Sequence, residues 1–392
     1  MQEIKMPRTV FSQVLDYLPD RHFRRCVQRY QGDSRVHTFS CMDQFICMAF
    51  AQLSYRESLR DIEATLRALG SKLYRMGIRG KISRSTLADA NERRDWRIYA
   101  DLAKPLIRRA RALYADEKLA VDLDATAYAL DTTAIDLSLS LFPWAKFTRQ
   151  YGSLRLHTQM DLRGRIPTFI SITDGKSQDK RLLDILPLET GAFYIMDRGY
   201  LDYKRMYRID QAGAFFILRA RKDTRTKRIY SHPIDKNLGL RADQTVSFVD
   251  RASLKRYPDQ LRRINYTDPK SKARFIWLSN NFDLPAETIP ELYRLRWSIE
   301  VFFKWIKQNL RIKAFYGTSA NAVKTQVWIS ITVYLLVAIL KKDLNLDHSL
   351  MTILQILSVT LFEESPILQV LNAEMDEPTN TLFSNQLELF NS

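Results

Sequence analysis

Three acidic residues lie in sequence contexts that suit a catalytic or metal-binding carboxylate as well as a solvent-exposed one. Asp131 lies in the segment YALDTTAIDL, and Asp197 ends the apolar run AFYIM. Glu300 lies in YRLRWSIEVFFKWIKQNL (293–310), whose other charged residues are all Arg or Lys. Carboxylate oxygens are hard ligands that suit Mg²⁺ or Mn²⁺ better than zinc. The three acids therefore predict a divalent-metal site.

The residues around Glu300 predict a surface for a polyanion. On a helix that turns about 100° per residue, Tyr293, Arg296, Glu300 and Lys307 fall within an arc of roughly 60°, with Lys304 close to it. This face is about 21 Å long at about 1.5 Å per residue, comparable with several nucleotides. The alternative is an ion-paired surface helix, because Arg296 and Lys304 each stand four residues from Glu300. Taken by itself, Glu300 favours that alternative.

The two aspartates also have alternatives. A strand that ends in Asp is a common way to hold a metal ligand at the edge of a sheet, but a turn-capping Asp gives nearly the same pattern. Asp122 and Asp124 remain rival candidates for the first ligand on the residues alone. Asp136 is expected to face another direction from Asp131 if the strand ends between them. We interpret His157, in RLHTQMD, as a structural strand residue.

The elements that position these residues change character along the chain. Residues 1 to about 115 show apolar positions at helical spacing. After the turn GIRGK (77–81), the short helix in SRSTLADANERRDW is compatible with helix-turn-helix DNA binding, so we predict that Arg93 and Arg94 contact DNA.

From residue 118 the pattern indicates strands. The runs at 118–141, 153–175 and 191–200 are rich in Val, Ile, Thr and Tyr, with a hairpin turn at 162–164 and a short helix in RLLDILPLE. A β-rich block follows, with strands in AFFILRARK, QTVSFV, LRRINYT and ARFIWLSNN. A helix is then predicted from Thr288, where TIPE offers a capping box, to about Asn309. This order predicts a mixed α/β core.

Charge and composition limit the partners. The formal charge of +16 and the pI near 9.7 indicate a polyanionic partner. The three cysteines lack CxxC spacing, so a reducing cytosol is expected, with neither a zinc site nor a disulfide framework. The apolar run at 327–340 is shorter than the roughly 20 residues of a membrane span, and we interpret it as a core helix. The acidic segment 343–392 has no Lys or Arg, so we expect it to contact protein.

The order of these acids resembles a known family. Asp131, Asp197 in MDRGY, and Glu300 within Tyr-x2-Arg-x3-Glu-x6-Lys are similar to the DDE transposases of bacterial insertion sequences, in particular the group named after insertion sequence four. The resemblance covers about residues 118 to 340 and has one departure, Gln178, where His is expected. The signature positions are Tyr293, Arg296, Glu300 and Lys307.

The resemblance implies an α/β fold with a ribonuclease-H-like mixed-sheet catalytic core. This core would span residues 116–342 and carry a β-rich insertion at about 213–285. A helical DNA-binding domain, residues 1–115, would precede it, and an acidic helical region, residues 343–392, would follow and contact protein.

The resemblance also implies an activity. A DNA transposase would cut the ends of its insertion sequence and join them to target DNA by cut-and-paste transposition, through a hairpin intermediate. Two Mg²⁺ or Mn²⁺ ions would be held by Asp131, Asp197 and Glu300. The partners would be double-stranded inverted-repeat ends, target DNA and a second copy in a homodimer or higher synaptic complex, in the bacterial cytoplasm on the nucleoid and not at a membrane. DNA contacts would come from Tyr293, Arg296, Lys304, Lys307, Arg198 and Trp297, the last by stacking on an unpaired base.

Two other functions stay open on these residues. One is a DNA-binding regulator that keeps the fold without catalysis, although all three acids are present. The other is a related nuclease that cuts without joining.

Overall fold

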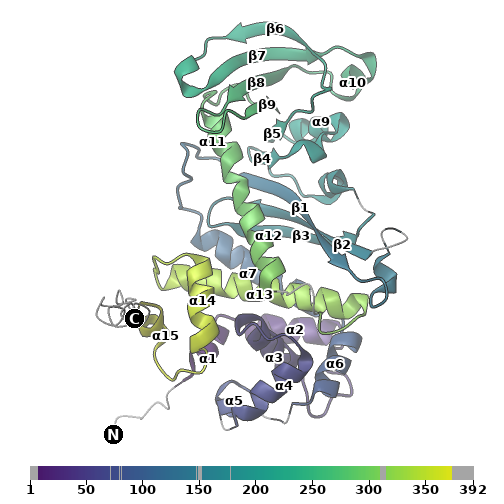
Figure 1. Cartoon of the computed structure of the whole chain (residues 1–392), viewed down its shortest axis with the longest axis vertical. Helices are drawn as coiled ribbons and strands as arrows, with labels where there is room; N and C mark the ends of the chain where they lie inside the picture. Colours follow the sequence, from purple (N-terminus) through teal and green to yellow (C-terminus); the bar gives the residue numbers. More distant parts are fainter. Residues whose placement is uncertain are drawn as a thin grey trace, which may run out of the picture.

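A mixed sheet dominates the computed structural model, which describes residues 8–70, 72–78, 80, 82–146, 148, 152–176, 178–309 and 315–372, without the side chains of 308 and 309. Within these residues, nine strands form one sheet in the order β3-β2-β1-β4-β5-β9-β8-β7-β6 (Figure 1). The strands are β1 (Ala127–Leu137), β2 (Gly152–Asp161), β3 (Ile166–Asp174), β4 (Phe193–Met196), β5 (Phe215–Arg219), β6 (Thr226–His232), β7 (Leu240–Phe248), β8 (Leu261–Thr267) and β9 (Arg274–Ser279). The predicted mixed α/β class is confirmed.

Helices flank this sheet at both ends of the chain. The regular elements described before β1 are all helical, as the sequence predicts: α1 (Val10–Leu15), α2 (Asp20–Arg29), α3 (Cys41–Leu53), α4 (Leu59–Ala68), α5 (Lys72–Arg75), α6 (Arg84–Arg93) and α7 (Arg97–Leu113). The later helices are α8 (Leu182–Ile185), α9 (Tyr203–Gln211), α10 (Arg251–Arg256), α11 (Thr288–Leu295), α12 (Trp297–Asn309), α13 (Ala320–Asp343), α14 (Leu350–Thr360) and α15 (Ile367–Asn372). Short 3₁₀ turns are η1 (Pro143–Ala145), η2 (Asp179–Arg181), η3 (Arg198–Tyr200) and η4 (Lys236–Leu238).

The β-rich block continues the core sheet and does not form a separate layer. Strand β5 pairs in parallel with β4, and β9 then pairs antiparallel with β5, so the strands of the block extend one edge. Strand β6 and helices α9 and α10 were not predicted, and α10 has only six residues. Strand β6 is an edge strand whose residues are nearly all exposed, so its sequence lacks an apolar alternation. Helix α9 buries only Met206 and Ile209, which gives a weak helical pattern.

The helix predicted from Thr288 to about Asn309 is divided at Arg296. The Arg296 N–H donates to the Tyr293 carbonyl, and the Ile299 N–H donates to the Arg296 carbonyl, so the chain makes a tight three-residue turn between α11 and α12. The predicted capping box does not form at this helix start, because the N-cap is Glu287 and no described side chain caps it.

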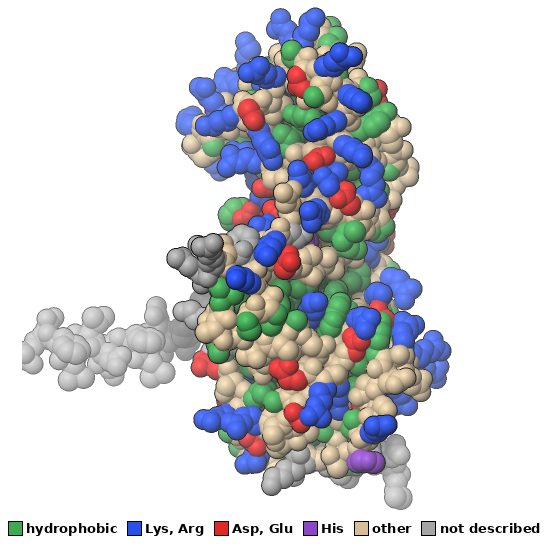
Figure 2. Space-filling model, turned by 90° about the vertical axis from the view of Figure 1, so that its right-hand side faces the viewer, with side chains coloured by type: hydrophobic (Ala, Val, Ile, Leu, Met, Phe, Trp, Pro, Cys, Tyr) green, Lys and Arg blue, Asp and Glu red, His purple; other side chains and the backbone are tan. Residues whose placement is uncertain are grey.

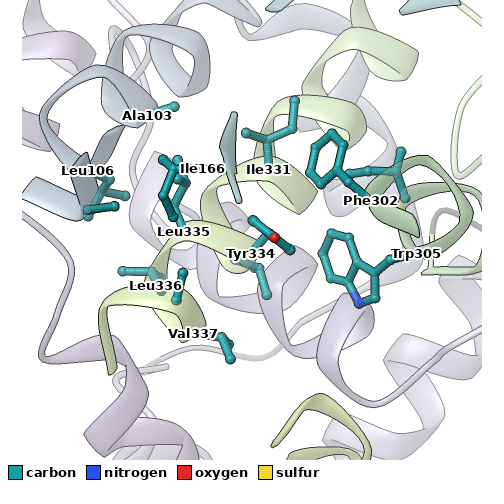
Figure 3. Close-up of a cluster of buried hydrophobic side chains, with 14 of the residues drawn as sticks. Ala103, Leu106, Ile166, Phe302, Trp305, Ile331, Tyr334, Leu335, Leu336 and Val337 are labelled. Atoms are coloured by element: carbon teal, nitrogen blue, oxygen red, sulfur yellow. The ribbon is translucent and has the colours of Figure 1, made fainter. Parts of the chain in front are cut away.

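Helix α13 is the common core of the molecule. It lies between the sheet and the N-terminal helices (Figure 1) and contacts α3, α6, α7, α12 and α14. The Tyr334 ring packs 5.1 Å from the rings of both Phe302 and Trp305 on α12 (Figure 3). By length and composition α13 is apolar enough to cross a membrane, but 94% of its most apolar window is buried inside the protein. It is the core helix that the sequence predicts.

The acidic C-terminal region contacts its own chain where it is described. Helix α14 buries Ile353, Leu354 and Leu357 and contacts α1, α3 and α13. The backbone N–H groups of Val10 and Phe11 donate to carbonyls in the segment that follows α14. Residues 373–392, with the rest of the predicted protein-contact region, lie outside the described residues.

Candidate active site

The register of two parallel strands brings Asp131 and Asp197 together. Strands β1 and β4 are paired up to Leu130 and Met196, and the two aspartates are the next residues on each strand. Adjacent strands lie about 4.8 Å apart, so the two acids stand side by side at one edge. Asp197 also caps η3, since its side chain accepts from the Gly199 N–H at 2.8 Å. Asp197 therefore lies beside Asp131 at the edge of the sheet and also caps a turn, so the two interpretations of this residue do not exclude each other.

Helix α12 presents Glu300 to the same place. The Arg296 guanidinium donates from Nη1 to Asp131 Oδ2 at 2.8 Å and from Nη2 to Glu300 Oε1 at 2.6 Å. Its side chain is only 12% exposed, and its buried Nε has no hydrogen-bond partner among the described residues. The ion pair between Arg296 and Glu300 that the sequence offers as an alternative is present. The additional bridge to Asp131 was not predicted, because it joins segments far apart in the chain.

The charges at this site act on one another. Burial raises the pKa of Asp131 to about 6, Arg296 and the Thr132 N–H oppose that rise, and the charges of Asp197 and Glu300 add to it. The positive Arg296 is therefore not enough to restore an ordinary pKa to this carboxyl. A buried carboxyl on which two other acidic charges act gains from a further positive charge.

A pocket of about 480 Å³ opens in front of the bridged acids. Asp131 and Glu300 line it, and Lys304 and Lys307 on the next turns of α12 bring two ammonium groups to the same walls. Its remaining lining residues are Thr132, Thr133 and Phe303. The pocket thus combines acidic and basic groups, as a site for a phosphate held beside metal ions requires.

The carboxylates fit a divalent cation by donor type but are not arranged around one. Among the residues that the structure describes, no three His, Cys, Asp or Glu side chains are close enough to hold an ion together. The Arg296 guanidinium instead lies between Asp131 and Glu300, where it supplies the positive charge that two facing carboxylates need. Hard carboxylate oxygens around a cationic position are the chemistry that Mg²⁺ or Mn²⁺ uses. The donor set fits such an ion once Arg296 gives up its bridge.

The rival acids lie elsewhere. Asp122 and Asp124 are exposed in the segment before β1, and the buried strand residues 127–130 lie between that segment and Asp131. Asp136 is exposed and faces away from the site, but not for the predicted reason: β1 continues to Leu137, and the odd spacing from Asp131 places Asp136 on the other face. His157 is buried in β2 and hydrogen-bonded to two threonines, as expected of a structural residue.

The other residues of the predicted DNA face differ in exposure. Tyr293 is half-buried, with its ring 5.3 Å from that of Trp277 and the Arg296 guanidinium 5.6 Å from its centre. Trp297 is 64% exposed and lies outside the core. Arg198 is exposed beside Asp197. Tyr293 therefore orients Arg296, while Trp297 and Arg198 are accessible to a ligand.

Of the two arginines predicted to contact DNA from α6, one is misassigned. Arg94 is 8% exposed and donates to the Ser40 carbonyl at 2.9 Å, to Gln44 Oε1 at 3.1 Å and to the Phe39 carbonyl. It joins α6 to α3 and is not available to DNA. Arg93, one residue earlier, is 80% exposed and remains a candidate.

Lys and Arg side chains also gather away from the pocket. Figure 2 shows them over the upper part of the molecule, where Figure 1 places β6 to β9. The positive charge of the chain is thus displayed on the surface of the extended sheet, where a polyanion can reach it.

Known proteins share sequence with this chain. Residues 117–336 match the family model described as "Transposase DDE domain", and residues 7–79 match a domain of unknown function (DUF4372). A Sinorhizobium fredii protein named as a transposase is 30% identical over 302 residues, 75% of this chain and 81% of that protein. A Geobacillus stearothermophilus protein named as the transposase of an insertion sequence element is 26% identical over 230 residues, 56% of this chain and 59% of that protein. The piggyBac transposase in its synaptic complex with hairpin DNA is similar at a TM-score of 0.45 and 9% identity, over 98% of this chain and 85% of that one.

Proposed function

The chain belongs to the DDE transposase family, as a DNA-cleaving and strand-transferring enzyme of a bacterial insertion sequence, and on that premise we propose which residues do the chemistry. Asp131, Asp197 and Glu300 are the catalytic acids. The observation that carries this proposal is that Asp131 neighbours both other acids: the β1–β4 register places Asp197 beside it, and Arg296 joins it to Glu300. The sheet around them is the core of a ribonuclease-H-like fold in this proposal.

The three acids would hold Mg²⁺ or Mn²⁺, two ions in all. Such ions, when bound, lower the pKa of water or of a 3′-hydroxyl and stabilise the leaving oxygen of a phosphate. The chain's own contribution is to place the acids on rigid elements: Asp131 within β1, Asp197 directly after β4 and Glu300 on α12. Arg296 neutralises Asp131 and Glu300 in the resting protein, and it turns to a DNA phosphate when the acids take up metal.

The basic side chains hold the substrate. Lys304 and Lys307 line the pocket and bind the phosphates on either side of the scissile bond. Trp297, exposed next to Arg296, stacks on an unpaired base near the cut. Arg198 and Arg93 contact the DNA backbone outside the pocket.

The reaction sequence we propose is cut-and-paste transposition through a hairpin intermediate. Water cleaves one strand at each end of the element, and the freed 3′-hydroxyl attacks the opposite strand, which forms a hairpin on the element end and releases the flanking DNA. Water then opens the hairpin, and the regenerated 3′-hydroxyl attacks a phosphodiester of target DNA, whose own 3′-hydroxyl leaves. Two ends must be processed together, so a homodimer or larger synaptic complex is required. In this proposal residues 1–115 bind the terminal repeats, and the basic surface of β6 to β9 lies along DNA.

An end-cleavage assay tests the proposal. The substrate is labelled duplex carrying the inverted repeats that flank the gene, with Mg²⁺ and a target plasmid. We expect the wild type to cut and to join. We expect Asp131→Asn, Asp197→Asn and Glu300→Gln each to abolish cutting while end binding stays within about twofold. Asp136→Asn, an exposed carboxylate on the same strand, is the matched control and should remain active.

The same assay separates the other two functions. A regulator binds the ends without cutting them, and a nuclease cuts them without joining. If any of the three acid variants kept near-full strand transfer, the role of that acid would be refuted.

A further inference from the structure

Four hydrogen-bonded side chains lie on the sheet face opposite the acids. Thr132 follows the first aspartate on β1, so its side chain points to the other face. There its Oγ1 lies 2.8 Å from His157 Nδ1 and 2.9 Å from the Tyr200 hydroxyl. His157 Nε2 in turn lies 2.8 Å from Thr173 Oγ1. These hydrogen bonds connect β3, β2, β1 and η3, the turn that follows β4.

The bonds have a defined direction. The Thr173 hydroxyl donates to the neighbouring Asp174 carbonyl at 3.2 Å, so it accepts from His157 Nε2–H. Nδ1 then accepts from the Thr132 hydroxyl, and that hydroxyl accepts from Tyr200. This order gives every hydroxyl and the imidazole N–H an acceptor, and it requires a neutral His157 with its proton on Nε2. Burial lowers the pKa of His157 and raises that of Tyr200, and both shifts favour this arrangement.

The location of these four hydrogen-bonded side chains is more informative than their contribution to stability. Backbone pairing between β1 and β4 ends at Leu130 and Met196, one residue before each aspartate. Past that point, the bond between Thr132 and Tyr200 joins the two segments again, from the opposite face. The Tyr200 ring is 1% exposed within a core of other apolar side chains, so the ring should stay buried when the hydroxyl is removed. The hydroxyl is therefore not needed to keep the ring buried, and its bond to Thr132 can align the two segments.

We propose that Tyr200 and Thr132 are positioning residues, which fix the separation of the Asp131 and Asp197 carboxylates, with His157 as their anchor. The inference rests on the proposed function, because it assigns the two aspartates to one metal site. Without the Tyr200 hydroxyl, the turn after β4 keeps its packing but loses the described side-chain hydrogen bond to β1 that lies past the backbone pairing. The Asp131 and Asp197 carboxylates would then hold a metal ion at a more variable distance. Mutation of residues that orient metal ligands changes metal affinity or activity by about 10- to 100-fold.

The test uses three variants of the full chain. Tyr200→Phe removes one hydroxyl and leaves Thr132 bonded to His157. Thr132→Val removes the link at its centre, and Thr132→Ser restores the hydroxyl on a similar side chain. Mn²⁺ affinity, measured by electron paramagnetic resonance without DNA, should fall about 10-fold or more in Tyr200→Phe and Thr132→Val and recover in Thr132→Ser. The unfolding temperature of Tyr200→Phe and its affinity for element ends should match the wild type.

A second readout is independent of catalysis. In ¹⁵N-histidine-labelled protein, the imidazole of His157 should carry its proton on Nε2, and its Nδ1 resonance should shift in Tyr200→Phe. Wild-type Mn²⁺ affinity in both Tyr200→Phe and Thr132→Val would overturn the inference, as would a proton on Nδ1. If the wild type binds Mn²⁺ but never cuts element ends, the proposed function fails, and a loss of Mn²⁺ affinity in Tyr200→Phe still supports the inference.

Discussion

Replacing Asp131 with asparagine should stabilise the metal-free protein at neutral pH. The folded chain holds this carboxylate in a buried place beside two other acids, and one guanidinium does not offset the cost. The asparagine amide would keep the shape of the side chain and one acceptor for Arg296, which also retains Glu300 as a partner. Function and stability are thus expected to oppose each other at this position.

The size and sign of the effect follow from the pKa of Asp131. Folding raises that pKa from 3.8 to about 6, so the folded state binds the proton more tightly. The associated stability is fully present below pH 3.8 and is lost as the pH rises through about 6. At about 1.4 kcal/mol per pH unit, the loss at pH 7.5 approaches about 3 kcal/mol. For a chain of this length that is about 4 °C in unfolding temperature.

The assay is thermal unfolding in EDTA at pH 4.5 and pH 7.5. We expect Asp131→Asn to unfold at a higher temperature than the wild type at pH 7.5 and to show about a third of that difference at pH 4.5. Asp136→Asn, exposed on the same strand, is the control and should follow the wild type at both values. Excess Mg²⁺ should stabilise the wild type and reduce the difference. A variant no more stable than the wild type at pH 7.5 would refute the argument that burial governs this site.

Three further outcomes follow from neighbouring residues. Lys307→Ala should lower DNA affinity and reduce the slope of log affinity against log salt by about 1, measured by fluorescence anisotropy between 50 and 200 mM salt; an unchanged slope would exclude a phosphate contact. Trp297→Ala should weaken binding to ends with an unpaired base by about 1–3 kcal/mol and leave fully paired duplex unaffected; equal effects on both would argue against stacking. Arg94→Met should lower the free energy of unfolding in urea by about 2–3 kcal/mol, because buried carbonyls lose a charged donor. Arg93→Gln should leave the free energy of unfolding unchanged and weaken DNA binding. The reverse pattern in these two variants would overturn both assignments.

Local pattern was sufficient for much of the fold. Apolar runs that end in a polar residue marked β1 and β4, and helical periodicity marked the N-terminal helices and α13. Strand β6 and helix α9 were missed because an exposed edge strand and a helix with two buried residues leave little apolar pattern. The division at Arg296 was missed because its backbone stays helical on both sides.

The contacts at the candidate site could be predicted only in part from the residues near each position in the sequence. The spacing within the α12 segment placed Glu300 among basic residues, but the bridge from Arg296 to Asp131 spans 165 positions and has no local signal. Arg93 and Arg94 look alike in sequence, and only the packing of α6 on α3 separates an exposed cation from a buried one. The small hydroxyl residue after Asp131 was visible, whereas its partners on β2 and η3 depend on the topology of the sheet.

The burial of α13 limits how this protein can be divided. Asn321 at its start donates to carbonyls beside α6, and the Tyr114 hydroxyl at the end of α7 donates to the Ala338 carbonyl near its other end. A fragment cut at residue 115 would leave one side of this apolar helix in water and should aggregate. The N-terminal helices are therefore not a module that can be exchanged independently of the rest of the chain. Any exchange of these helices has to bring a matching surface for α13 with them.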